Sequence, residues 1–521
     1  MSQFAAPAIA WGALTPILIV FGAAVIGVLV EAFVPRGPRR TIQCVIALFA
    51  VAVALVAVVW RWTIAAHFGS TSVLNGSLQE DPFSLGAQGI LLVVTLFALL
   101  MIADRTSLGD GAFAASGATR PGSVEEEDYT RAGFAQTEVF PLMLFSLGGM
   151  LVFPATADMV TLFIALEVLS LPLYILCGLA RRRRLLSQEA SLKYFLLGAF
   201  SSAFMLFGIA LVYGFSGSFR FAEIAEAVVL VAGKDTLLLA GCVLILVGLL
   251  FKVGAAPFHT WTPDVYQGAP TPITGFMAAS TKLAAFAALL RFWYTIAYQM
   301  QWDLNGPMLG AAVLTMLIGT VLGIVQNDIK RMLAYSSIAH VGFLLLGVVS
   351  LTQQALGGTL FYLLAYGLAT VGAFGIVSLV REVDSDGNIT SEATSLEQWA
   401  GLGKRHPLLA AAMVIFLLSF AGIPLTSGFI GKFVVFSAAV SGGLAWAVVI
   451  AVIASAATAF FYVRLIVLMY LTDAKDERTV AVDTEGPTSI AIALCAAATF
   501  VLGIVPGPAL NMANHASLLL P

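Results

Sequence analysis

The stretch LLLAGCVLILVGLLFKVGAAP, residues 237–257, decides the fold. It is long and apolar enough to cross a bilayer, because about 20 helical residues span a hydrocarbon core of ~30 Å. Lys252 is its only charged residue, and Gly254 and Pro257 lie at its end. A proline removes a backbone donor and frees a carbonyl one turn back. The segment therefore predicts a membrane helix that breaks beside a buried charge.

The composition of the whole chain indicates a membrane protein. Of the 521 residues, 60% are hydrophobic and 11% are charged, whereas an ordinary soluble domain is roughly 25% charged. Continuous apolar runs predict helices rather than the alternating strands of a barrel. We expect an all-α polytopic membrane protein with about 14 transmembrane helices, near residues 13–34, 42–64, 85–103, 139–155, 159–180, 192–214, 237–257, 273–297, 308–326, 331–350, 357–380, 408–440, 444–471 and 488–505. The first run lacks a basic leader, which predicts a retained span rather than a signal peptide.

The basic residues are distributed unevenly between the predicted loops. Loops after an even number of spans hold only Arg220 and Lys234. Loops after an odd number hold seventeen, namely Arg36, Arg39, Arg40, Arg105, Arg120, Arg131, Arg181, Arg182, Arg183, Arg184, Lys330, Arg331, Arg381, Lys404, Arg405, Lys475 and Arg478. Cytoplasmic loops carry such an excess, so we expect both termini on the non-cytoplasmic side. The pattern gives no indication of nucleic-acid binding, and we interpret Arg61, Arg291 and Arg464, near span ends, as interfacial anchors.

Similar features recur about 170 residues apart. The break Gly254-Ala255-Ala256-Pro257 is repeated as Ala421-Gly422-Ile423-Pro424, and Tyr194 and Asp158 correspond to Tyr362 and Asp328. The spacing predicts two five-helix repeats, spans 4–8 and 9–13, with broken helices 7 and 12. Because five is odd, the second copy is inverted, as in many transporters. We expect four parts: 1–138 with three spans and a cytoplasmic loop, 139–297 and 308–471 as the repeats, and 488–521 with the last span and tail.

Four ionisable residues interrupt otherwise apolar spans: Glu167, Lys252, Lys282 and Lys432. Each costs at least ~2.5 to 3.5 kcal/mol at bilayer depth, so a proton path is the leading interpretation. Glu167 is the one carboxylate predicted at mid-depth, and we expect it to pair with Lys252. When that pair opens, the freed Lys252 cation repels a proton from Lys282. The alternatives are a static ion pair that fixes helix packing and breaks that are mere packing kinks.

Several other polar residues have more than one interpretation. Lys193 could reach the headgroups, pair with Glu189 or take part in the path. His259 and His340 could relay protons or be hydrogen-bonded core histidines. Phosphate-loop, haem, flavin and nicotinamide motifs are missing, so we expect no cofactor and no metal site in this chain. The cysteines lie singly in apolar segments, which indicates that they pack in the core; they are Cys44, Cys177, Cys242 and Cys495.

Three segments carry a resemblance to a known family. They are FKVGAAPFHTWTPDVYQGAPTP (residues 251–272), STK (280–282) and NDIKRMLAYSSIAH (327–340). They resemble the antiporter-like membrane subunits of respiratory complex I, the NADH:quinone oxidoreductase. Within that family the VYQGAPTP form is most similar to the bacterial subunit N branch, and the resemblance extends over essentially the whole chain.

The resemblance implies a fourteen-helix, inverted-repeat subunit that moves protons while quinone is reduced elsewhere in the complex. It implies that Glu167 and Lys252 form a modulating pair, that Lys282 is the central relay, that Lys432 lies on the exit side and that Lys193 connects sites. It also implies a bacterial plasma-membrane location, contacts with subunits M, K and J and with the bilayer, and NADH, FMN, iron-sulfur clusters and quinone in other subunits. A subunit of a multisubunit sodium/proton antiporter and a purely structural scaffold are the alternatives.

Overall fold

The computed structural model describes residues 9–105, 111–120, 123–132, 136–230, 235–383, 389–473, 479–481 and 486–519. Helices dominate these residues, which confirms the predicted all-α class. Lys234, Lys475 and Arg478, which belong to the predicted charge pattern, lie outside the described residues.

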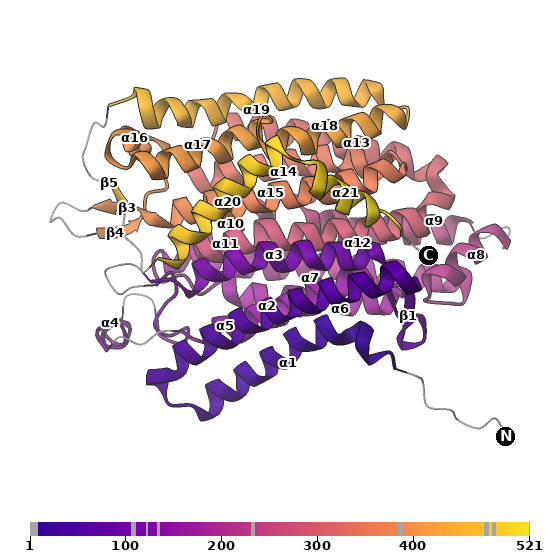
Figure 1. The fold of residues 1–521 in the computed structure, drawn as a ribbon, viewed down its shortest axis with the longest axis horizontal. Helices are drawn as coiled ribbons and strands as arrows, with labels where there is room; N and C mark the ends of the chain where they lie inside the picture. Colours follow the sequence, from indigo (N-terminus) through magenta and orange to yellow (C-terminus); the bar gives the residue numbers. More distant parts are fainter. Residues whose placement is uncertain are drawn as a thin grey trace.

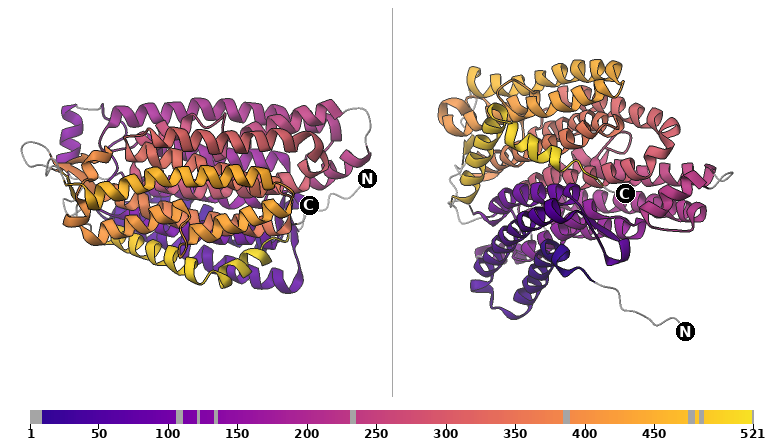
Figure 2. Two further views of the ribbon diagram at one scale, coloured as in Figure 1. Left: turned by 90° about the horizontal axis from the view of Figure 1, so that it is seen from above. Right: turned by 45° about the vertical axis from the view of Figure 1, so that its right-hand side comes forward.

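Most of the helices lie side by side along one direction (Figures 1 and 2). The N-terminal part consists of α1 (Trp11–Phe33), α2 (Arg36–Phe68), α3 (Pro82–Ala103) and α4 (Val124–Arg131). The middle part consists of α5 (Val139–Val152), α6 (Met159–Cys177), α7 (Arg184–Ser216), α8 (Phe221–Leu230), α9 (Asp235–Val253), α10 (Trp261–Gly268), α11 (Thr271–Phe276) and α12 (Lys282–Thr295). The rest consists of α13 (Gln301–Ile324), α14 (Ile329–Val349), α15 (Gln353–Leu379), α16 (Leu402–Arg405), α17 (Pro407–Ala421), α18 (Ser427–Ser441), α19 (Ala445–Leu471), α20 (Pro487–Ile504) and α21 (Gly507–His515).

Short strands lie at the two ends of the helix bundle. They are β1 (Thr71–Val73), β2 (Leu78–Glu80), β3 (Val380–Val383), β4 (Ile389–Glu392) and β5 (Thr479–Ala481). β1 and β2 form an antiparallel hairpin, in which Ser72 lies opposite Gln79. β3 is the centre of an antiparallel sheet of order β4-β3-β5, in which Arg381 lies opposite both Glu392 and Val480.

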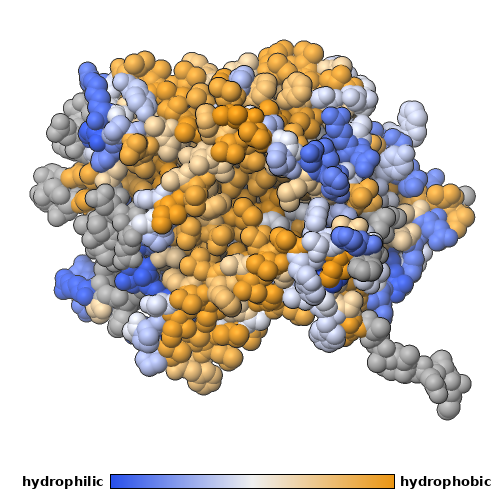
Figure 3. Space-filling view, in the orientation of Figure 1, coloured by the Kyte–Doolittle hydropathy of each residue, from blue (hydrophilic) through white to orange (hydrophobic). Residues whose placement is uncertain are grey.

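The outer surface of the bundle has the polarity of a membrane protein. In the described part of the chain, twelve helices are long and apolar enough to cross a membrane, and shorter apolar helices occupy Val139–Ala155, Pro407–Ala421 and Ser427–Ser441. Every predicted span overlaps one of these helices, except that α17 and α18 divide the predicted span 408–440. Figure 3 shows apolar side chains across the middle of the molecule and hydrophilic ones toward both ends.

The two ends of the bundle differ in charge. α4, α16 and the β4-β3-β5 sheet lie at one end, whereas β1, α8 and the start of α1 lie at the other (Figure 1). We name the first the basic end, because basic residues of the predicted pattern such as Arg183 and Lys330 lie there. They form ion pairs with Glu382 and Glu392 of the sheet strands. Arg220 lies at the opposite end, where it pairs with Glu223 of α8. The predicted one-sided charge pattern therefore maps onto the two ends of the described structure.

The core of the bundle is formed by three segments that the lipid does not reach. The run Thr271–Thr295 and α14 are wholly buried inside the protein, and α15 is buried almost as completely. By contrast, α2 and α7 bury well under half of their apolar stretch. α15 contacts α18, α20, α11 and α14, so it links both halves of the chain. Polar side chains on these three segments are therefore shielded from lipid.

The two predicted helix breaks adopt the same backbone geometry. α9 and α17 are followed by Gly254 and Gly422, each with φ +81°, a conformation that glycine adopts without a steric penalty. In both breaks the amides of the glycine and of the next residue donate to one carbonyl of the preceding helix. In the first break Gly254 N and Ala255 N donate to Leu250 O at 3.1 and 2.9 Å, and in the second Gly422 N and Ile423 N donate to Leu418 O, both at 3.0 Å. One detail was not expected. After the first break the chain forms a further half-helix, α10, where the sequence predicted a loop.

The interpretation of Arg291 as an interfacial anchor was wrong. Its side chain is 1% exposed and donates to both carboxylate oxygens of Asp81, at 2.8 and 2.9 Å, and to Pro154 O at 2.7 Å. Asp81 also caps α3 by accepting from Ser84 N at 2.8 Å. The ion pair therefore fixes α12 to the start of α3. A buried carboxylate makes this position favourable for an arginine, and sequence position alone does not reveal that partner.

Candidate proton path

Glu167 and Lys252 lie on facing helices, but their side chains do not meet. Lys252 is 2% exposed, and its ammonium donates to Ser170 Oγ at 2.8 Å and Tyr194 Oη at 2.9 Å. Glu167, one turn before Ser170 on α6, accepts a hydrogen bond from Ser202 of α7. The predicted direct pair is therefore replaced by two neighbouring polar groups on one face of α6. The Glu167 carboxylate acts on Lys252 through space rather than through contact.

Aromatic side chains enclose Lys252 and the first break. The ammonium lies 5.2 Å from the centroid of the Tyr194 ring, within the range of a cation–π interaction. Trp261, from α10, stacks on Tyr194 at 4.7 Å, and its indole donates to Phe251 O at 3.0 Å. Phe251 O, near the end of α9, thus accepts from the indole as well as from Gly254 N at 3.0 Å, so a side chain of the half-helix binds the main chain of the break.

Lys282 follows a distortion in the wholly buried run Thr271–Thr295. A π-helical turn, Met277–Thr281, ends directly before it. The ammonium, on a side chain 2% exposed, donates to Ser337 O of α14 at 3.0 Å and also to the Ser337 hydroxyl. π-bulges occur frequently at functional sites, because the extra residue redirects a side chain out of the helical register. Here the redirected side chain joins the middle part of the chain to α14.

His340 continues this polar line along α14, one turn beyond Ser337. Its Nδ1 lies 2.7 Å from Tyr362 Oη of α15, and its Nε2 lies 3.4 Å from Tyr462 Oη of α19. The ring of Tyr362 in turn packs against Gly431, the residue before Lys432. His340 is therefore a buried, hydrogen-bonded histidine positioned between the surroundings of Lys282 and those of Lys432.

Lys432 is bound to the second break itself. Its ammonium donates to Phe420 O at 2.7 Å and Ala421 O at 3.1 Å, the last carbonyls of α17, and to Ser455 Oγ of α19 at 2.7 Å. The side chain is 5% exposed. The aligned carbonyls at a helix end carry partial negative charge, which favours a cation. Helix-end carbonyls thus hold this lysine in the place of a carboxylate.

No described residue forms an ion pair with Lys252, Lys282 or Lys432, and no described hydrogen bond joins any two of the four predicted relay residues directly. Each lysine is instead held by neutral oxygens: hydroxyls, a phenol or main-chain carbonyls. Burial disfavours a charged ammonium, and neutral oxygens compensate that cost only in part. Such a lysine can exchange a proton when the local field changes.

Lys193 and His259 lie near the half-helix α10. Lys193 forms ion pairs with Glu189 Oε1 at 2.7 Å and Asp264 Oδ2 at 2.8 Å, and its side chain is 43% exposed. Asp264 of α10 also pairs with Arg331 of α14 at 2.8 Å. His259 lies half-buried in the break after Pro257. Sequence reasoning missed Asp264, although an acidic residue shortly after a predicted helix break was the available signal.

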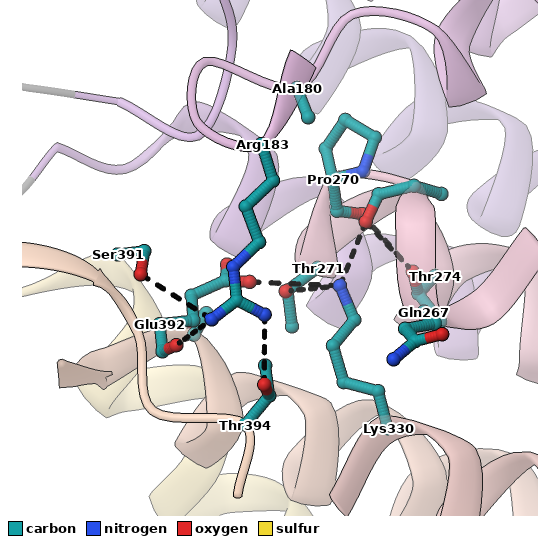
Figure 4. A network of polar contacts seen from close by, with 12 residues as sticks. Ala180, Arg183, Gln267, Pro270, Thr271, Thr274, Lys330, Ser391, Glu392 and Thr394 are labelled. Carbon is teal, nitrogen blue, oxygen red and sulfur yellow. Dashed lines mark hydrogen bonds and ion pairs between the residues drawn. The ribbon is translucent and has the colours of Figure 1, made fainter. Parts of the chain in front are cut away.

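A second polar network covers the basic end between α10 and α14 (Figure 4). Lys330, 2% exposed, donates to Ala269 O at 2.9 Å and Thr271 Oγ1 at 3.1 Å, and lies 3.6 Å from Glu392 Oε2. Arg183 reaches from before α7 to Thr394 Oγ1 at 2.8 Å. Burial alone would raise the pKa of the Glu392 carboxyl, but the cations of Lys330 and Arg381 hold it below its usual value. The network therefore joins α7, α10 and α14 through charged groups.

The described residues contain no group of three or more His, Cys, Asp or Glu side chains that could hold a metal ion. None of the residues that hold the lysines was predicted to contact them: Ser170 and Ser455 were not singled out, Tyr194 was noted only for its repeat counterpart, and Ser337 only as part of the segment 327–340. A serine or tyrosine in an apolar span is common, and only the fold shows which of them faces an ammonium.

Comparisons with known proteins cover nearly the whole chain. A family model described as NADH:quinone oxidoreductase/Mrp antiporter, TM, matches residues 156–458. The chain is 58% identical over 526 residues to NADH-quinone oxidoreductase subunit N of Beutenbergia cavernae, covering 99% of both chains. It is 51% identical over 532 residues to the protein of that description from Mycobacterium bovis, again covering 99% of both.

Solved structures show the same architecture. A chain of respiratory complex I from Thermus thermophilus with bound aureothin is 31% identical and superposes with a TM-score of 0.76, covering 96% of this chain and 99% of that one. A chain of the Mrp complex from a Dietzia species superposes with a TM-score of 0.79 at 20% identity, covering 98% of this chain and 97% of that one. The similarity to the Mrp chain shows a shared fold alone.

Proposed function

Because the chain belongs to the NADH:quinone oxidoreductase/Mrp antiporter family and, within it, to the subunit N group, we propose a proton path through its buried ionisable residues. The chain is a multi-pass, proton-translocating membrane subunit of complex I. In our proposal Glu167, Lys252, Lys282 and Lys432 carry the path, with His340 between the last two and Lys193 and His259 as secondary sites.

One observation supports these assignments above all others: each relay lysine is held by neutral oxygens beside an irregularity in its helix. Lys252 precedes the break after α9, Lys282 follows a π-helical turn, and Lys432 binds the carbonyls that end α17. A lysine that serves packing alone gains more from a carboxylate partner, because a charge without one remains costly. A lysine that must lose and regain a proton needs an environment that tolerates both states.

The proposed order of events starts at Glu167. A change in the electric field of the Glu167 carboxylate alters the protonation of Lys252. The charge of Lys252 then acts on Lys282. A proton from Lys282 then passes by Ser337, His340 and Tyr362 to Lys432. The supporting contacts are those of Lys282 with Ser337 and of His340 with Tyr362. The free energy comes from quinone reduction elsewhere in the complex.

Several finer assignments belong to the same proposal. The parts 139–297 and 308–471 act as inverted repeats, supported by the matching breaks and by Asp158 and Asp328, which cap α6 and α14 through their side chains. The chain itself carries no redox group, so NADH, FMN, the iron-sulfur clusters and quinone are bound by other subunits. Its direct partners are subunits M, K and J. Both termini lie on the non-cytoplasmic side of the bacterial plasma membrane, with the basic end in the cytoplasm.

Replacement of relay residues tests the proposal. In inverted vesicles that contain the complex, Lys282→Met and Lys252→Ala are expected to lower NADH-driven proton uptake by about tenfold or more, as the loss of a group that directly transfers protons does. The matched control is Lys404→Met, since Lys404 is an exposed lysine paired with Asp473 at the basic end. Full pumping in both relay variants would support a scaffold. Cation-dependent proton flux without NADH or quinone would support the antiporter alternative.

A further inference from the structure

We propose that a pocket at the basic end binds the phosphodiester headgroup of an anionic membrane lipid. The pocket lies between the α1–α2 turn, the end of α3 and the segment that precedes α5, and its volume is about 420 Å³. Four arginines and two carboxylates line it: Arg36, Arg39, Arg40, Arg105, Glu31 and Glu138. We call it the arginine pocket. Its size is that of a small-molecule site rather than of a gap between side chains.

Two arginines of the pocket, Arg39 and Arg40, are held by the helix ends. Arg39 donates to Glu31 Oε2 at 3.0 Å and through two nitrogens to Val34 O, at 3.1 and 2.7 Å. Arg40 donates to Ala103 O, the last carbonyl of α3, at 2.5 Å. The main-chain carbonyls of Val34 and Ala103 thus orient two guanidinium groups, and Arg39 is also paired with Glu31. A preorganised site of this kind loses little side-chain entropy when a ligand binds.

The charge of the lining favours an anion. Four arginines against two glutamates leave a formal charge of +2 on the lining residues. The guanidinium fork matches the geometry of phosphate oxygens and forms two parallel hydrogen bonds with them. Tyr129, Ser116 and Thr137 add hydroxyls to the same lining. An arginine that only fixes the orientation of a helix in the membrane needs no cavity in common with others. These four arginines line the same cavity.

The position of the pocket indicates a lipid rather than a soluble phosphate. Arg36 begins α2, Glu31 lies in the last turn of α1 and Arg105 follows α3, so the pocket is at the headgroup level of three membrane helices. The helices α1 and α2 also expose apolar side chains, for example Phe33 at 81% and Phe49 at 69%. Acyl chains can cover such a surface. In the orientation proposed above, on which this inference rests, the basic end faces the cytoplasm, and since that leaflet is rich in anionic lipids, the headgroup is available there.

Lipid binding to the purified native complex tests this inference. The delipidated complex is titrated with fluorescent phosphatidylglycerol and, separately, with phosphatidylcholine of the same acyl length. Arg36→Gln with Arg105→Gln is expected to weaken phosphatidylglycerol binding by about tenfold or more, because each arginine near a charged lipid surface contributes substantially to its attraction. Phosphatidylcholine binding is expected to stay unchanged. Glu138→Gln, which removes a carboxylate from the lining, is expected to strengthen phosphatidylglycerol binding severalfold.

The matched control is Arg120→Gln, an exposed arginine of the same cytoplasmic connection that does not line the pocket. Equal phosphatidylglycerol affinity in the control and in the double variant would overturn the inference. Full displacement of the lipid by glycerol phosphate at the concentration of the lipid would instead assign the pocket to soluble phosphates. Loss of a neighbouring subunit with unchanged lipid binding would assign it to a protein contact. Either outcome overturns the lipid proposal.

Discussion

Replacement of Gly422 by alanine directly perturbs the site that holds Lys432. Gly422 has φ +81°, and an added Cβ would lie 2.9 Å from Lys432 Cδ and 3.3 Å from its Nζ. Ordinary carbon contacts begin near 3.4 Å, so the lysine must withdraw by about 0.5 Å. The lysine is the flexible partner, because the backbone of the break is held by two amide hydrogen bonds to Leu418 O.

The size of the effect follows from the contacts that the lysine loses. A left-handed conformation costs a non-glycine residue roughly 1 to 2 kcal/mol. A hydrogen bond to a charged group contributes about 1.5 to 3 kcal/mol, and Lys432 donates two to the carbonyls of Phe420 and Ala421. Loss of one such bond lowers the population of the bound lysine by about ten- to a hundredfold, since ~1.4 kcal/mol is tenfold.

Gly443 provides the matched control. It has the same φ of +81°, and an added Cβ would meet nothing within 4 Å. Gly443→Ala therefore carries the backbone cost without displacing the lysine. The assay compares NADH-driven acidification of inverted vesicles with NADH:quinone turnover in the same preparation. We expect Gly422→Ala to pump about tenfold less per turnover than Gly443→Ala. Equal pumping in the two variants would refute the role of the helix-end carbonyls in holding Lys432.

Three further predictions concern ion pairs. Arg291→Met is expected to destabilise the protein by about 3 to 5 kcal/mol, because it removes the cation that faces the buried Asp81 carboxylate. Adding Asp81→Asn should restore part of the unfolding midpoint in detergent, and strict additivity of the two losses would contradict this. Asp264→Asn is expected to lower pumping less than loss of a relay lysine does, with NADH:quinone turnover retained, whereas full pumping would show that α10 needs no anchoring. The pKa of the Glu392 carboxyl is held low by Lys330 among other cations, so its stabilisation is complete above about pH 4.3, the unfolded value, and is lost as the pH falls through the lower folded value. The gap in unfolding midpoint between the protein and Glu392→Gln should therefore close in acid, and a constant gap would contradict this.

The sequence reveals those features of the fold that depend on the backbone. The helix breaks were predictable because proline removes a main-chain donor and glycine allows a left-handed conformation, and Gly254 and Gly422 both have φ +81°. The membrane class followed from the long apolar runs, since the bilayer imposes their length. The half-helix α10 was not predicted, because its eight residues are too short and too polar to show a helical pattern.

Contacts between helices were less predictable. The Glu167–Lys252 pair followed from charge and depth, but the rotation of α6 presents Ser170 to the ammonium instead. Two residues that are three positions apart lie about one helical turn apart. The depth in the membrane that is predicted from the sequence does not distinguish between them. The buried position of Arg291 depends on Asp81, a residue 210 positions away along the chain. Such partners become visible only when the helices are packed.

The neutral surroundings of the three lysines have an electrical consequence. Because no described carboxylate forms an ion pair with them, each proton that binds adds a whole charge that no contacting group cancels. Two unit charges ~15 Å apart in a medium of effective dielectric constant about 20 repel by ~1 kcal/mol. Protonation of one such lysine then lowers the proton-binding constant of its neighbour about fivefold. The lysines form an anticooperative array, in which protonation of the whole set spreads over a wider pH range than that of a single group.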